Sequence, residues 1–118
     1  MKAYLHLIHS PDADDLRTFE PTHSAFSLLL QMRVGPDSGS GEESFDVLLC
    51  TPDWLREKIE PVIGRHKLIV TTYDYGHIER FLTEQVDSCT GETWEEVATK
   101  VGRIGRWEFE DYKGIDPR

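Results

Sequence analysis

Apolar and polar residues alternate along three stretches of the chain, as in strands that bury one face against a core. The stretch 24–34 is the longest, and its expected buried positions are Phe26, Leu28, Leu30, Met32 and Val34. In residues 3–9 the alternation places Leu5 and Leu7 on one face and Ile8 on the other. The third stretch, 45–49, follows a connection rich in Gly, Ser, Pro and Asp at residues 35–43. That composition predicts an exposed hairpin, so we expect the second and third strands to pair antiparallel.

The segment FDVLLCTPDWL, residues 45–55, predicts a buried strand that leads directly into a helix. Thr51 can accept a hydrogen bond as the N-cap, and Pro52 suits the first helical position because its missing N–H has no helical partner there. Apolar residues then recur at helical spacing as far as Ile63, but Pro61 cannot donate a regular helical hydrogen bond. We therefore expect this helix to stop or kink near Glu60. Its apolar face is predicted to contain Trp54, Leu55, Ile59, Val62 and Ile63.

The second half of the chain predicts a strand followed by two helices. Residues 67–73, KLIVTTY, are rich in β-branched side chains, and Asp74 can cap the helix that follows. That helix has a stripe formed by Ile78, Phe81, Leu82, Gln85, Val86 and Cys89. The sequence TWEE at residues 93–96 matches a capping box at the start of the last helix. In the tail 107–112, WEFEDY, aromatic and acidic residues alternate, which fits either a short edge strand or an extended segment packed under the body.

These elements predict one α+β domain over residues 1–118. At 118 residues the chain is long enough to bury a core without disulfides or metals. We expect a mainly antiparallel sheet of about four strands with two or three helices packed on one face, in the order ββ-β-α-β-α-α. No internal repeat or linker composition divides the sequence.

The charge of the chain restricts the kind of partner that it can bind. There are 13 Lys and Arg residues against 22 Asp and Glu residues, a formal net charge of -9. Nucleic acids and anionic membranes are polyanions, so this balance disfavours both as partners and favours a basic protein. No apolar run approaches the roughly 18 residues of a membrane span, and residues 1–15 lack the pattern of a secretory signal. We expect a cytoplasmic protein.

The residues that could support chemistry lack the spacing of a catalytic or metal site. The five histidines are His6, His9, His23, His66 and His77. His6 and His9 are an odd number of residues apart, so a regular strand would point them to opposite faces. Cys50 and Cys89 form no CxxC pair and are expected to be reduced, buried thiols. We predict no catalytic residue, cofactor or metal, although a small hydrolase-like enzyme that combines a histidine with a carboxylate is one alternative.

Three stretches taken together resemble the immunity protein 8 family of bacterial polymorphic toxin systems. They are FDVLLCTPDWL at 45–55, GRHKLIVTTYD at 64–74 and GETWEEVATKVGRIGRWEFEDY at 91–112. The resemblance implies an α+β protein that protects a bacterium by binding a toxin domain in the cytoplasm, without turnover. The residues it marks as recurrent are Thr51, Pro52, Trp54, Asp74, Trp94, Trp107 and Glu108. Caps and core positions account for most of them.

The acidic balance is compatible with a basic, nuclease-like toxin as the partner, because opposite charge accelerates association. The hypothesis assigns toxin binding to acidic residues in three segments: Asp12, Asp14, Asp15, Glu95, Glu96, Glu108, Glu110 and Asp111. For Glu108, Glu110 and Asp111 a solvated acidic surface without a binding role is the favoured alternative, because such clusters arise readily in a chain with 22 acidic residues. A second alternative function is a generic acidic adaptor that docks on a housekeeping protein through this surface or through WEFEDY.

Overall fold

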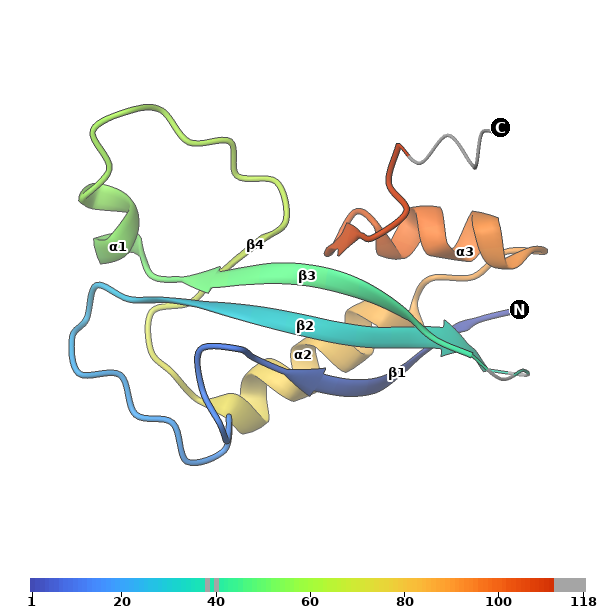
Figure 1. Ribbon diagram of the computed structural model, residues 1–118, viewed down its shortest axis with the longest axis horizontal. Coiled ribbons are helices and arrows are strands. Elements are labelled where there is room, and N and C mark those ends of the chain that lie inside the picture. The colour runs from blue at the N-terminus through green and yellow to red at the C-terminus, as the bar shows by residue number, and fades with distance from the viewer. Residues whose placement is uncertain (38, 40, 112–118) are drawn as a thin grey trace.

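A mixed sheet forms the centre of the molecule (Figure 1). The computed structural model describes residues 1–37, 39 and 41–111. The strands are β1 (Ala3–His9), β2 (Ser27–Pro36), β3 (Glu43–Cys50), β4 (Lys67–Ile69) and β5 (Arg106–Trp107). Their order is β1-β2-β3-β4, and β5 pairs with the other half of the β3 edge that β4 occupies. The β3–β4 pair is parallel and the other pairs are antiparallel.

The β2–β3 hairpin follows the predicted alternation. Leu30 pairs with Val47 and Met32 pairs with Phe45, and all four side chains are buried. Phe26 lies before the start of β2 and is only partly buried. The antiparallel pairing is confirmed, but the connection is shorter than the predicted 35–43, because Gly35 and Pro36 belong to β2 and Glu43 belongs to β3. Ser38 and Ser40 lie outside the described residues.

The predicted faces of β1 are wrong after its first half. The pairing with β2 shifts between Leu5 and Leu7, so His6 is an extra residue in a β-bulge. A bulge changes the face to which each later side chain points, because side chains alternate with a period of two. Leu7 is therefore exposed, while Ile8 is buried in the core. The alternation of apolar and polar residues could not predict the inserted residue, because that pattern assumes regular pairing between strands.

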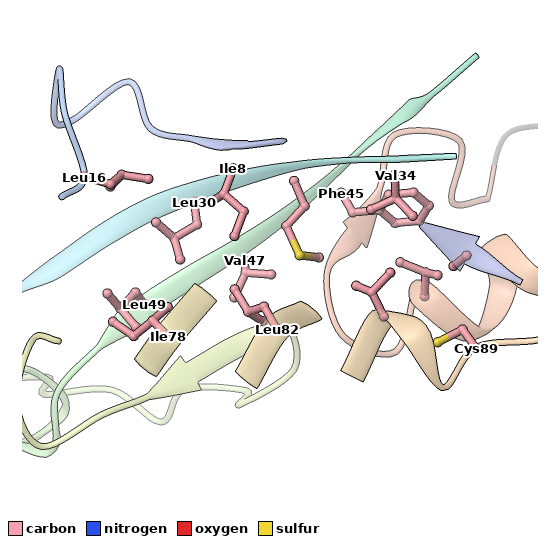
Figure 2. Packing of buried hydrophobic residues seen from close by; sticks show 14 of the residues in the cluster. Ile8, Leu16, Leu30, Val34, Phe45, Val47, Leu49, Ile78, Leu82 and Cys89 are labelled. Atoms are coloured by element: carbon pink, nitrogen blue, oxygen red, sulfur yellow. The ribbon is translucent and has the colours of Figure 1, made fainter. Parts of the chain in front are cut away.

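Two of the three helices cover one face of the sheet. These are α2 (Tyr75–Asp87) and α3 (Trp94–Val101), capped by Asp74 and Thr93 as predicted. Figure 2 shows Ile78 and Leu82 of α2 pointing toward the side chains of β3 in the buried cluster. The core residues that α3 contributes are Val97, Ala98 and Val101. The predicted α+β class is confirmed, in the form of a single compact domain.

The first helix, α1 (Pro52–Arg56), is shorter than the sequence predicts and buries none of its residues completely. Its start is confirmed: the buried Thr51 hydroxyl accepts the Trp54 N–H at 3.2 Å and donates to the Ser24 carbonyl at 2.6 Å. The helix ends at Arg56, before the expected stop near Glu60. The apolar helix face that was predicted to extend to Ile63 therefore does not form. Ile59 is 97% exposed and Ile63 is 82% exposed. One turn of helix gains too little from hydrogen bonds to continue without tertiary packing.

Trp54 is also misplaced by the sequence pattern. It is half-buried and lies outside the core cluster. The ammonium of Lys58 lies 3.8 Å from the centre of its ring, so the indole carries a cation on its face. The expectation that Trp54 fills the core is therefore wrong.

The last two strands are shorter than their sequence patterns. The strand predicted at 67–73 ends at Ile69, after which Thr71 and Thr72 are exposed. In the tail, the edge-strand interpretation is confirmed for Trp107, which pairs with Phe45 of β3. Residues 108–111 leave the strand, and Tyr112 lies outside the described residues.

Candidate functional site

The acidic residues predicted to bind a partner lie in three separate segments. The first is the loop after β1. There Asp12 accepts the Leu29 backbone N–H at 2.9 Å, which ties the loop to β2. Asp15 accepts the Arg17 N–H at 2.9 Å and so stabilises its own turn. Asp14 is exposed and has no polar partner among the described residues.

The second acidic segment is the first turn of α3. The Glu96 N–H donates to the Thr93 hydroxyl at 3.2 Å, as in the predicted capping box. Its carboxylate accepts the N–H of Glu92 at 3.0 Å, one residue before the cap. Glu95 is exposed, and its negative charge lies at the positive end of the helix dipole.

The third acidic segment follows β5. Glu108 forms a reciprocal pair with Ser44: its carboxylate accepts the Ser44 N–H at 2.8 Å, and its own N–H donates to the Ser44 carbonyl at 3.0 Å. Glu110 lies 3.2 Å from the Arg65 guanidinium and 3.8 Å from His66 Nε2. Asp111 is exposed in the left-handed backbone region, at φ 62°. Most of the eight carboxylates therefore stabilise the fold, and the exposed ones without such a bond are Asp14, Glu95 and Asp111.

Glu43 is a carboxylate that the sequence pattern did not single out. One of its oxygens accepts the indole N–H of Trp94 at 2.9 Å and that of Trp107 at 2.8 Å. The contact connects β3, α3 and β5 at one point. Nothing in the local sequence indicates this role, because the Trp107 indole reaches Glu43 through the pairing of β3 with β5, and the Trp94 indole reaches it from α3.

The part of β1 that contains the bulge lines a groove. His6 and His9 both line this groove, which has a volume of about 380 Å³ and also contains Asp14, Asp15 and Glu79. Glu79 is paired with Arg17 at 2.8 Å. Within the described residues, neither histidine lies within hydrogen-bond distance of a carboxylate of the groove. The described part of the chain also contains no group of three His, Cys, Asp or Glu side chains placed to hold a metal ion.

Burial governs the titration of the other reactive side chains. It raises the pKa of both thiols, Cys50 and Cys89, and both cysteines are free. It also raises the pKa of Tyr75 to about 12, with a further contribution from the Glu79 carboxylate. These groups are protonated at neutral pH, which makes them unsuited to act as nucleophiles.

A second groove, of about 410 Å³, lies beside β4 and α2. Ile69 and Phe81 line it and are 51% and 41% exposed. The sequence placed Phe81 in the buried stripe of α2, which is wrong: Ile78 and Leu82 fill the core, while Phe81 lies at the margin of the sheet beside the short β4. The sequence could not show that the sheet ends at β4.

The fold and these surfaces define the class of the molecule: a single α+β domain with a mixed sheet, which displays carboxylates on its surface and exposes Ile69 on its short edge strand β4. The chain belongs to the immunity protein 8 family, whose model matches residues 3–112. This match confirms the resemblance and extends it over the first two strands. Neither a curated protein nor a solved structure matches the chain. Among the described helices, none has the length and apolar character needed to cross a membrane.

Proposed function

We propose that this protein binds and neutralises a cognate polymorphic toxin domain in the cytoplasm, without catalysis. The observation that carries the proposal is the family match over residues 3–112, which includes every strand and helix of the fold. Membership supports a toxin-immunity role in general. Neutralisation by binding is the simplest form of that role, because it requires no substrate and no catalytic residue.

The net charge of -9 supports a basic partner such as a nuclease-like toxin. Asp14, Glu95 and Asp111 are free to meet basic side chains, because their carboxylates make no bond that the fold requires. The other five predicted residues can add to the long-range field while they stabilise the fold. Neither nucleic acid nor a membrane surface is a favoured partner for a surface of this sign.

Co-expression with the toxin domain encoded by the neighbouring open reading frame tests the proposal. We expect the protein to restore growth of cells that express the toxin, and to co-purify with an inactive form of it. Failure of both would contradict the proposed function. A complex with a housekeeping protein, formed equally well in cells without the toxin, would instead favour the adaptor alternative.

The double variant His6→Ala/His9→Ala separates binding from catalysis. Both histidines line the β1 groove, where a hydrolase-like mechanism would place its base. Inhibition by binding predicts that the folded variant protects cells as well as the unchanged protein does. A folded variant that still binds the toxin but no longer protects would favour the enzymatic alternative.

A further inference from the structure

The strand β4 presents an open edge. The Leu48 N–H donates to the His66 carbonyl and the Val70 N–H donates to the Cys50 carbonyl, both at 2.9 Å. These bonds show that the even-numbered residues of this segment turn their backbone groups toward β3. In a parallel ladder the intervening residue turns its N–H and C=O the opposite way. The N–H and C=O of Ile69 therefore face away from the sheet, without a described protein partner.

The other exposed parts of the sheet are protected against pairing. On the far side of the sheet, β1 is interrupted by the bulge at His6, and Lys2 forms a bridge with Thr90. The half of β3 that β4 does not reach is covered by β5. Bulges and covering segments are the usual means by which proteins prevent edge-to-edge pairing. At β4 the lysine that could guard the edge is engaged elsewhere, because the Lys67 ammonium donates to the Ile63 carbonyl at 2.7 Å.

The groove beside β4 has apolar and polar lining residues, and its apolar part includes Ile69 and Phe81. Its volume of about 410 Å³ lies in the range of roughly 300–1,000 Å³ that is usual for ligand sites. Leu68 pairs with the buried Leu49 and faces the helices, so Ile69 points to the opposite face of the sheet. Phe81 of α2 lies on the helix side. A strand added at this edge would thus contact Phe81 with one set of its side chains and Ile69 with the other.

We propose that an extended segment of the toxin domain adds to the open edge of β4 as a further strand. The inference rests on the proposed function and deepens it by naming the surface. The backbone N–H and C=O of Ile69 supply the main-chain hydrogen bonds, as in other complexes formed by strand addition. Apolar residues of the segment fill the groove against Phe81, and basic residues beside it meet the acidic field of the molecule.

Two substitutions at Ile69 test the proposal with the inactive toxin domain of the neighbouring open reading frame as the probe. Ile69→Pro removes the outward N–H and leaves the bonds to β3 intact, and proline is tolerated on the exposed side of an edge strand. Ile69→Lys places a charge on the docking edge. Leu7→Lys is the matched control, because Leu7 also lies on an edge strand and is 54% exposed against 51% for Ile69. All three variants are first shown to unfold at similar urea concentrations.

We expect both Ile69 variants to raise the Kd for the toxin domain by about tenfold or more. The control should keep a Kd within about threefold of that of the unmodified protein. Hydrogen exchange on the unmodified protein supplies a readout that needs no mutation: the Ile69 amide should exchange more slowly in the complex. Binding by the unmodified protein with an unchanged Kd for both Ile69 variants, or with an unprotected Ile69 amide, would overturn the inference alone. Absence of binding by the unmodified protein would remove the proposed function and this inference with it.

Discussion

At the scale of single residues, Glu43 contributes to stability through one carboxylate oxygen shared by two indoles. We predict that Glu43→Ala lowers the free energy of unfolding by about 1–3 kcal/mol, because two charge-assisted hydrogen bonds at a partly buried site are lost. Urea denaturation followed by tryptophan fluorescence measures the change and also reports on both indoles.

Glu43→Gln is the control for that change. Its side-chain oxygen can still accept an indole N–H without the negative charge, so we expect a smaller loss than for alanine. Equal losses for the two variants would show that the negative charge, and not the volume of the side chain or a neutral hydrogen bond, determines the contribution of Glu43.

Trp54 and Phe45 are both large aromatic residues but differ in burial. Phe45 is fully buried, whereas Trp54 is half-exposed on α1. We predict that Phe45→Ala costs about 3–5 kcal/mol, as for other buried aromatic residues, and that Trp54→Ala costs about 1 kcal/mol. The two free energies of unfolding, measured in urea under the same conditions, test the assignment of Trp54 to the surface. Similar losses of stability for the two variants would show that Trp54 is packed in the core.

The buried thiols predict slow chemical modification. Since burial raises the pKa of Cys50 and of Cys89, thiolate is scarce in the folded protein below the ordinary thiol pKa. Labelling with a thiol reagent at about pH 8 should therefore be slow in buffer and fast in urea, and two thiols should react after unfolding. Rapid labelling of the folded protein would contradict the burial of these side chains.

At the scale of elements, the segment between α1 and β4 is an exposed connection, although its apolar residues have the spacing of a helix face. Ile59 and Ile63 have helical spacing relative to α1, yet they are almost completely exposed in a connection that contains Pro61. We predict that Ile59→Ser and Ile63→Ser each change the free energy of unfolding by less than about 0.5 kcal/mol. Ile78→Ser is the control, because this buried position of α2 should lose several-fold more. A large loss for either loop variant would show that the predicted apolar helix face does pack.

At the scale of the whole molecule, the net charge of -9 should act on association and not on the fold. We predict that the association rate with the inactive toxin domain falls about tenfold or more between about 0.01 M and about 1 M salt, as the Debye length shrinks from roughly 30 Å to roughly 3 Å. Stopped-flow fluorescence measures this rate. An unchanged rate would exclude electrostatic steering.

The triple variant Asp14→Asn/Glu95→Gln/Asp111→Asn tests whether these three carboxylates produce the electrostatic attraction of the toxin. It removes three exposed charges that make no hydrogen bond or ion pair among the described residues. Stability should fall only slightly, through the lost interaction of Glu95 with the helix dipole, while the association rate falls and its salt dependence weakens. The control Glu57→Gln/Glu60→Gln/Glu84→Gln removes three exposed charges elsewhere. Equal effects of the two variants would show that total charge matters more than its position.

The sequence by itself determined the elements whose periodicity is strong and whose ends carry local caps. The buried faces of β2 and β3, and the caps at Thr51, Asp74 and Thr93, depend on neighbours along the chain, so a pattern of period two or 3.6 specifies them. The match to the immunity protein 8 family, over residues 3–112, includes all of these elements.

Tertiary structure decided the features that depend on pairing between distant segments. The bulge at His6 exchanged the faces of Leu7 and Ile8, and the end of the sheet at β4 left Ile69 and Phe81 exposed. Glu43 gained its two indole partners in the same way, from β5 paired with β3 and from α3 packed beside them. Register and sheet edges are set by which strands meet, and a linear pattern of apolar residues does not contain that information.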